Sequence, residues 1–151
     1  MLIQTGKSPI VPVVLVEGKD GDFWQRWEDF TKGGLLKEGW ISPEDPGLYR
    51  IVSSPEEAVE EITSFYRVYQ SARYVHDKLV LRLTRALTEQ ELAVLNDEFS
   101  ILIESGRIEN SAALPEEEEV THLPRLVFHH TKHKFGLVRL LIDRINGFDA
   151  P

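Results

Sequence analysis

The stretch from Ile10 to Val16 limits the fold of this chain more than any other feature. It is a continuous apolar run rich in valine, which is typical of strands buried on both faces of a parallel sheet. Pro12 cannot donate a backbone hydrogen bond, so a fully central place in the sheet is less favoured. The run is far shorter than the roughly 20 apolar residues that span a bilayer. We therefore expect an α/β fold without a membrane segment.

The next segment predicts a helix and a second strand. Four aromatic residues recur at helical spacing and are expected to form one buried stripe: Phe23, Trp24, Trp27 and Phe30. The pair Gly33-Gly34 predicts the end of this helix, and a polar loop then leads to a short strand over Leu48–Val52.

A strong start signal predicts the following helix. Ser54 is suited to the N-cap, Pro55 to the first helical position, and Glu57 closes a capping box. The apolar spacing continues this helix to about Ala72. The resulting strand, helix, strand, helix order implies a parallel sheet, and two strands are too few to cover themselves.

The pattern changes from Lys78 onward. Lys78–Thr84 predicts a strand, and Thr88 with Glu91 predicts a capping box for a helix that stops before Gly106. Segments 107–113 and 125–131 predict paired strands, and 137–145 predicts a final helix. This β-α-β-β-α order is ferredoxin-like but short of its last strand. We expect an α+β lobe over residues 76–151, distinct from residues 1–75.

Charge and composition exclude several function classes. The formal net charge of −8 disfavours nucleic acid as a partner. The chain contains no cysteine, which excludes disulfides, thiolate metal sites and cysteine nucleophiles. No charged-then-apolar leader precedes the first strand, so we expect a cytoplasmic protein.

The region around the histidines is locally basic. His129, His130 and His133 lie close in sequence, but neighbouring strand positions face opposite ways and no carboxylate stands at ligand spacing, so no metal site is expected. Four cations could instead form an anion patch: Arg125, Lys132, Lys134 and Arg139. The alternative is that these cations pair with the acidic loop Glu116–Glu119 or with another subunit.

The turn Gly18–Asp22 follows the first strand and opens a helix, where open α/β sheets bind ligands. It lacks the Gly-x-Gly-x-x-Gly and Walker patterns, and Asp20 and Asp22 would repel a phosphate. Capping of the helix is the expected role of these aspartates. No Ser, His and acid set has the spacing of a hydrolase triad, so no catalytic residue is assigned.

Three segments carry a resemblance to a known family: Leu2–Ile10, Gly18–Trp24 and Ser53–Ala58. They resemble the C-terminal half of Lonely Guy (LOG) family proteins, over about residues 1–72. The resemblance implies a Rossmann-like fold for residues 1–75. Characterised members, formerly labelled lysine decarboxylases, are phosphoribohydrolases that release a base from nucleoside 5′-monophosphates without a cofactor and form homodimers.

The motif that defines this family, Pro-Gly-Gly-x-Gly-Thr-x-x-Glu, would fall just upstream of Met1. Leu2–Thr5 would then be the end of the helix that begins at the motif. By this resemblance at most four residues line the rim of the parental site: Thr5, Gly6, Gly18 and Trp24. We expect a fragment that is inactive alone and that associates into homo-oligomers through exposed apolar surface.

Two functions remain open at this point. One is the C-terminal part of a nucleotide phosphoribohydrolase. The other is a non-catalytic module that binds a small molecule or a partner, as ferredoxin-like regulatory domains do. An independent lysine decarboxylase is excluded, because no lysine has the context that holds pyridoxal phosphate.

Overall fold

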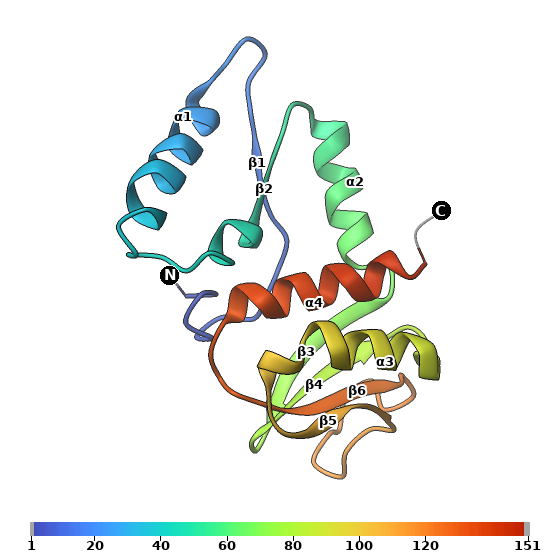
Figure 1. Ribbon diagram of the computed structural model, residues 1–151. Coiled ribbons are helices and arrows are strands. Elements are labelled where there is room, and N and C mark those ends of the chain that lie inside the picture. The colour runs from blue at the N-terminus through green and yellow to red at the C-terminus, as the bar shows by residue number, and fades with distance from the viewer. Residues whose placement is uncertain (1, 150–151) are drawn as a thin grey trace.

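The computed structural model describes residues 2–149, which contain two small sheets (Figure 1). The C-terminal helix packs between the two sheets. The first sheet is a parallel pair with a helix after each strand, and we call residues 2–65 the parallel lobe. Its elements are β1 (Val13–Val16), α1 (Phe23–Phe30), β2 (Tyr49–Val52) and α2 (Pro55–Phe65). The predicted parallel strands are therefore present, although β1 begins three residues later than the apolar run that predicted it.

The glycine pair does not end the first helix, contrary to the sequence expectation. A π-helical segment, η1 (Thr31–Leu36), continues α1 through Gly33 and Gly34. A 3-10 turn, η2 (Asp45–Leu48), then leads into β2. Glycine lowers helix stability without forbidding a helix, and here the wider π turn accommodates both glycines.

The expected buried aromatic stripe is also wrong. Phe23 and Phe30 are 61% and 62% exposed, and Trp27 is 38% exposed. Helix α1 contains no buried residue at all. The physical reason is the size of the sheet, because a two-stranded pair offers too little surface to cover an aromatic helix.

Helix α2 begins with Ser54 as its N-cap and Pro55 as its first residue, as predicted, but it ends early, and the predicted capping box is incomplete because Glu57 accepts from Ser53 rather than from Ser54. The Ser54 hydroxyl accepts from the Glu57 amide at 3.2 Å, and the Glu57 carboxylate accepts from the Ser53 amide at 2.7 Å. The helix stops at Phe65 rather than near Ala72, because Tyr69–Val75 forms strand β3. Strand pairing with β4 overrides the helical spacing of these residues.

The second sheet has four antiparallel strands in the order β3-β4-β6-β5. We call residues 69–147 the antiparallel lobe, and the expected β-α-β-β-α order from Lys78 onward is present within it. The sheet also takes in β3, which comes from residues assigned to the first domain by sequence. Its further elements are β4 (Lys78–Leu83), α3 (Glu89–Glu98), η3 (Ser100–Leu102), β5 (Ile103–Ser111), β6 (Arg125–His130) and α4 (Phe135–Gly147).

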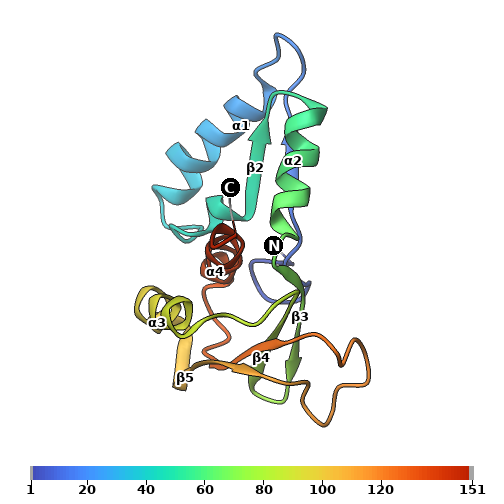
Figure 2. The same ribbon diagram turned by 90° about the vertical axis from the view of Figure 1, so that its right-hand side faces the viewer.

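The main core lies between this sheet and helices α3 and α4 (Figure 2). Leu79, Leu81 and Leu83 of β4 alternate toward the helices, while Val80 belongs to a small cluster on the opposite face. The predicted capping box of α3 is formed in full by Thr88 and Glu91. Local signals and apolar alternation thus account for most of this lobe.

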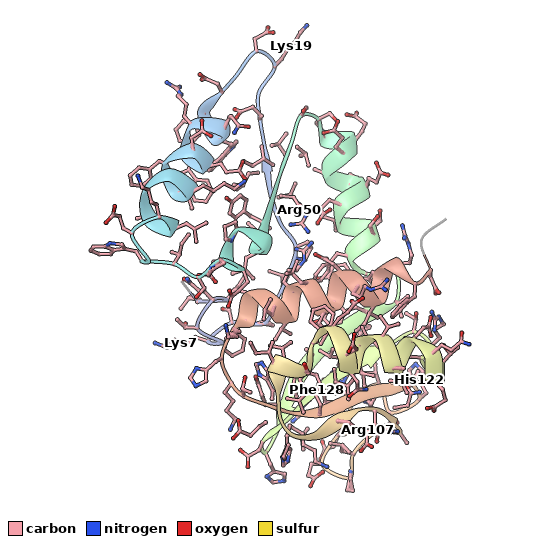
Figure 3. The ribbon with its side chains drawn as sticks, in the orientation of Figure 1. Lys7, Lys19, Arg50, Arg107, His122 and Phe128 are labelled. Carbon is pink, nitrogen blue, oxygen red and sulfur yellow. The ribbon has the colours of Figure 1, made fainter. Side chains whose placement is uncertain are left out.

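Helix α4 joins the antiparallel lobe to the parallel lobe through partly buried polar contacts. Arg139 donates to Glu61 of α2 at 2.6 Å and to Asp143 at 2.9 Å. Arg50, labelled beside β2 in Figure 3, donates to Asp143 of α4 at 2.9 Å. Burial raises the pKa of Asp143, although Arg139 and Arg50 act against this effect. These ion pairs fix α4 of the antiparallel lobe against α2 and β2 of the parallel lobe.

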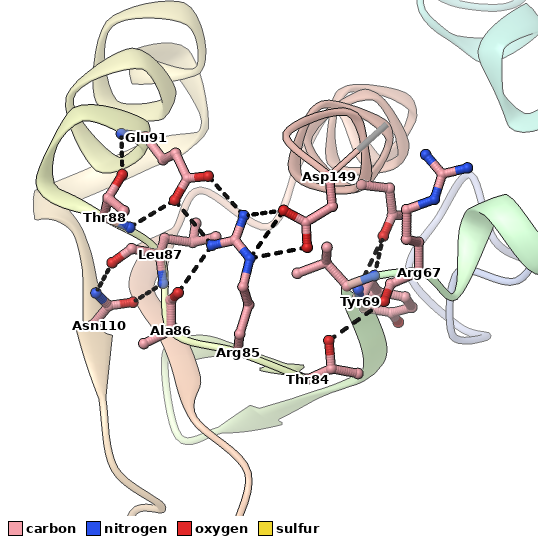
Figure 4. Close-up of polar contacts among 12 residues, drawn as sticks. Arg67, Tyr69, Thr84, Arg85, Ala86, Leu87, Thr88, Glu91, Asn110 and Asp149 are labelled. Carbon is pink, nitrogen blue, oxygen red and sulfur yellow. Dashed lines mark hydrogen bonds and ion pairs between the residues drawn. The ribbon is translucent and has the colours of Figure 1, made fainter. Parts of the chain in front are cut away.

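Arg85 fastens the end of the described chain to the antiparallel lobe (Figure 4). Its guanidinium donates to Glu91 at 2.7 Å and to Asp149 at 2.6 Å. Beside it, Asn110 exchanges two hydrogen bonds with the backbone of Leu87. Among residues 2–149, no helix has the length and apolar character needed to cross a membrane.

The segment before β1 is a compact turn that ends like a helix. Lys7 donates its amide to the Leu2 carbonyl and Gly6 donates to the Ile3 carbonyl. Gly6 has a φ of 69°, and together these features form the Schellman motif that closes helices. The expected helix end is thus matched by its terminating turn, while Met1 lies outside the described residues.

Candidate functional site

A hollow of about 910 Å³ lies in the parallel lobe. Its walls come from the turn before β1, one face of β1, the inner side of α1 and η1, and η2. Most of the lining is apolar. The lining residues are Leu2, Ile3, Gln4, Ser8, Pro9, Val11, Val13, Leu15, Trp24, Trp27, Thr31, Leu35, Ile41, Asp45, Leu48 and Tyr49.

The apolar character of the hollow follows from the sequence period of β1. Val11, Val13 and Leu15 stand at every second position and line the same hollow. Opposite them, Trp27 packs edge-to-face on Trp24 at 6.0 Å and on Tyr49 at 5.0 Å between ring centroids. The result is a hollow with an aliphatic wall and an aromatic wall.

The polar side chains of the hollow are engaged with neighbouring groups. Gln4 donates to Asp45, whose carboxylate also accepts from the Ser42 amide at 2.8 Å. The Tyr49 hydroxyl contacts Glu28 at 3.4 Å, and burial together with the Glu28 charge raises the pKa of Tyr49 to about 12. A neutral phenol held in this way is suited to hydrogen bonding rather than to proton abstraction at neutral pH. The hollow is built for apolar binding.

The N-terminus of α1 is capped by a carboxylate of the chain itself, that of Glu17. The Glu17 carboxylate accepts from the amides of Phe23, Trp24 and Gln25 at 3.2, 2.8 and 3.2 Å. Asp22 occupies the N-cap position but makes no capping hydrogen bond, so the expectation that the aspartates cap this helix is wrong for Asp22. A carboxylate on the helix N-terminus takes the position that a ligand phosphate would use.

The four residues expected at the rim of a nucleotide site do not gather around one cavity. Trp24 lines the large hollow, whereas Thr5 and Gly6 line a hollow of about 300 Å³ beside Tyr74 and Phe135. Gly18 belongs to the turn after β1. Figure 3 shows Lys19, the residue after Gly18, at the tip of the molecule and Lys7, the residue after Gly6, near α4. Only Trp24 therefore reaches the candidate site.

The four cations expected to form an anion patch lie in different ion pairs on different elements. Arg139 is paired with Glu61 and Asp143, as described above. Lys132 donates to Asp77 at 2.7 Å, and Lys134 lies 3.8 Å from Glu44. Arg125 is fully buried against Glu117 at 3.0 Å. That pair matches the alternative in which the basic region binds the acidic loop.

The neighbouring histidines His129 and His130 contact different partners and do not form a shared site. His129 contacts Ser105 at 2.8 Å through Nδ1, and His130 contacts the Tyr74 hydroxyl through Nδ1. Burial lowers the pKa of His130 to about 4, so this ring is neutral at pH 7. Across residues 2–149 there is no group of three or more metal-ligating side chains arranged to hold an ion.

The sequence alternative included the Arg125–Glu117 pair, but it did not anticipate that Arg82 joins this buried charge cluster. Glu117 lies between Arg82 and Arg125, with its two carboxylate oxygens 3.1 Å and 3.0 Å from their Nε atoms. Burial raises the pKa of Glu117, but hydrogen bonds from Arg125, the Leu114 amide and Arg82 outweigh burial and hold its pKa below the ordinary value. The alternation of Arg82 with apolar neighbours in β4 was the available signal.

Comparison with protein-family models, with curated proteins and with solved structures found no match for this chain.

Proposed function

We propose that this chain supplies the carboxyl-terminal strands of a Rossmann-like sheet in a nucleoside 5′-monophosphate phosphoribohydrolase of the Lonely Guy type. The observation that carries the proposal is that the sheet of the parallel lobe has only two strands among the described residues and is incompletely buried. Within the described residues, β1 pairs with β2 alone, and no residue of either strand is fully buried. Parallel sheets are normally covered on both faces and have more strands than two. The lobe therefore fits the end of a larger sheet.

The hollow beside β1 supports the same proposal. Val11, Val13 and Leu15 form an apolar wall that faces Trp24 and Trp27 across about 910 Å³. Apolar surface of this extent is unfavourable in water. A strand or helix packed against Val11, Val13 and Leu15 would bury the aliphatic wall and leave Trp24 free, and we assign that role to the part of the enzyme that carries the glycine-rich motif.

The turn before β1 adds a second line of support. Gly6 and Lys7 complete a Schellman motif with Leu2 and Ile3, which is the form in which helices end. In the proposed enzyme this turn ends the helix that begins at the glycine-rich motif. The helix would thus run alongside the hollow and contribute to its cover.

The proposal assigns this chain a binding role and no catalytic residue. In parallel sheets the ligand lies beyond the carboxyl ends of the strands, and here Glu17 already neutralises the start of α1. The phosphate is therefore assigned to the glycine-rich motif, and the ribose and base to the apolar side. Trp24 is the residue of this chain placed to contact a base by ring stacking.

For the antiparallel lobe we infer a circularly permuted ferredoxin-like arrangement. In the ferredoxin-like order the last strand lies beside the first and antiparallel to it. Here β3, which precedes β4 in sequence, takes that position. The strand that the sequence order left missing is thus supplied from the other end of the lobe.

The test is base release from a panel of nucleoside 5′-monophosphates. The chain is measured alone and as a fusion behind a LOG-family segment that contains the glycine-rich motif. We expect base release by the fusion alone, and none when the glutamate of the motif is changed to glutamine. A fusion that folds as a stable unit but releases no base contradicts the proposal, as does turnover by the chain alone.

A second function has a specific observation in its favour. The volume of the hollow falls within the roughly 300–1,000 Å³ of small-molecule sites, and its aromatic wall suits a flat apolar ligand. A non-catalytic binding module would show saturable quenching of Trp fluorescence by such ligands in the chain alone. Trp27→Ala should abolish this quenching, with Trp40→Ala as the control, because Trp40 is exposed and does not line the hollow.

A further inference from the structure

The face of the antiparallel sheet that is opposite to α3 and α4 holds two arginines directly opposite each other. Arg82 of β4 and Arg125 of β6 are partners in the strand register, and they are 6% and 0% exposed. Like charges at directly opposed positions repel, and burial away from water increases the cost of each charge. Such a pair is stable only with an anion between the two guanidinium groups.

The chain provides that anion from a loop. One Glu117 oxygen lies 3.1 Å from Arg82 Nε and 3.0 Å from Arg82 Nη2, and the other lies 3.0 Å from Arg125 Nε. The Glu117 side chain is fully buried. Charge-assisted hydrogen bonds from arginine are also how proteins commonly recognise carboxylate and phosphate ligands.

The charge of the cluster remains incompletely balanced. Two buried arginines face a single buried carboxylate, because Glu119 is 3.9 Å from Arg82 and its side chain is 80% exposed. The outer nitrogen of Arg82, Nη1, reaches only the Ser71 hydroxyl at 3.4 Å by hydrogen bonding. Arg82 therefore keeps donor capacity on the side that faces away from Arg125.

The loop that carries Glu117 is long and irregular, and Arg125 also donates to its Val120, Leu123 and Glu119 carbonyl oxygens at 3.1, 2.6 and 3.3 Å. It connects β5 to β6 over residues 112–124 without a helix or strand, whereas most hairpin loops contain about 2–5 residues. Its Val120 has a φ of 44°, a backbone conformation that is strained for a β-branched residue. Displacement of the loop would relieve this strain and uncover both arginines.

We propose that Arg82 and Arg125 form an oxyanion-binding site that Glu117 occupies from within the chain, and that the 112–124 loop is displaced when a carboxylate or phosphate group of a small molecule binds. This site lies on the antiparallel lobe and is independent of the function proposed for the parallel lobe. Its ligand competes with Glu117 for the same guanidinium groups. The fraction of molecules in which the loop is displaced therefore rises with the concentration of the anion.

The first test compares Glu117→Gln with Glu118→Gln. Both changes remove one negative charge from the same loop, but Glu118 is exposed whereas Glu117 is buried. The melting temperature is measured against sodium phosphate and, separately, sodium acetate, at constant ionic strength set with chloride. For Glu117→Gln we expect a saturable rise of roughly 5–10 °C at a hundredfold excess over Kd. Wild type and Glu118→Gln should respond less.

The two anions distinguish the source of the ligand charge. A rise with both indicates a general oxyanion site, and a rise with only one assigns the site to carboxylates or to phosphates. Adding Arg82→Met to Glu117→Gln should remove the rise. An equal response of Glu117→Gln and Glu118→Gln to both anions would overturn the proposal.

A second measurement covers the case in which Glu117→Gln does not fold. The chain contains no cysteine, so Glu118→Cys provides a single position for a spin label on the loop. Phosphate or acetate should increase the mobility of this label in a saturable way, whereas the same label at Glu89→Cys, an exposed position of α3, should not respond. A loop label that responds no more than the α3 label refutes displacement.

Discussion

The contact between α4 and the loop before β2 can be tested with a single methyl group. An added Cβ at Gly136 would lie 2.7 Å from the backbone oxygen of Glu44 and 2.8 Å from its carbonyl carbon. Neither atom can rotate away as a flexible side chain would. We therefore predict that Gly136→Ala weakens the attachment of the parallel lobe to α4.

The magnitude is the balance of two terms. Replacing a helical glycine by alanine gains at most about 1 kcal/mol, while overpacking against a rigid contact costs about 1–3 kcal/mol or somewhat more. Because the distance to Glu44 is well below van der Waals contact, we expect the steric term to exceed the helical gain. The expected net loss is about 1–2 kcal/mol, or a fall in Tm of roughly 2–8 °C.

The same helix contains a matched control. Gly147 is the last residue of α4, and an added Cβ there meets nothing within 4 Å. Gly147→Ala should leave the free energy of unfolding unchanged or raise it by up to about 1 kcal/mol. The two variants thus share the chemical change and differ only in the contact with Glu44.

Urea unfolding monitored by two signals gives the assay. All three tryptophans lie in the parallel lobe, so their fluorescence reports that lobe, while far-UV circular dichroism reports both lobes. In Gly136→Ala the fluorescence midpoint should fall, and it should fall further than the midpoint from circular dichroism. If Gly136→Ala and Gly147→Ala unfold at the same urea concentration, the close contact does not hold the lobes together and the reasoning is refuted.

Three further outcomes are expected. The pKa of buried His130 is about 4, below its ordinary value of 6.5, so the unfolded state binds more protons than the folded state between these two pH values. The contribution of His130 to the free energy of unfolding should therefore be complete above pH 6.5 and fall by about 3 kcal/mol as the pH drops to 4. His130→Gln should flatten this part of a pH series of urea midpoints. Thr88→Ala removes the hydroxyl that accepts from the Glu91 amide and should lower the free energy of unfolding by about 1 kcal/mol in the same assay. An unchanged urea midpoint would show that this cap does not stabilise the protein. Gly6→Ala adds a Cβ against the Phe135 ring at a φ of 69° and should lower Tm, whereas an unaltered thermal scan would show that this turn is loosely held.

The start signals of the helices show how far local chemistry reaches. Ser54 with Glu57 and Thr88 with Glu91 predicted two helix starts, and the structure contains both. A cap is formed by residues three apart in sequence, so its energy does not depend on the rest of the fold. The apolar alternation in β4 is equally local, because each strand residue reports its own face.

Tyr69–Val75 shows where local signals fail. Its aromatic spacing extends the helical pattern of α2, yet the segment forms β3 and pairs with β4 through a turn at His76, which has a φ of 54°. The competing energies are the hydrogen bonds of one more helical turn and those of a new sheet edge together with burial of Tyr69. The energy of sheet pairing and of Tyr69 burial depends on residues distant in sequence, so the spacing of residues within the segment does not predict it.

The candidate sites divide in the same way. The sequence by itself determined the apolar period of β1, the acidic loop and the presence of isolated basic residues. The tertiary structure decided that the aromatics of α1 stay exposed and that Arg82 meets Arg125 across the strand register, with Glu117 between them. Exposure depends on how much sheet is available to cover a helix, and charge pairing depends on which strands become neighbours. Both are non-local properties that emerge only when the lobes assemble.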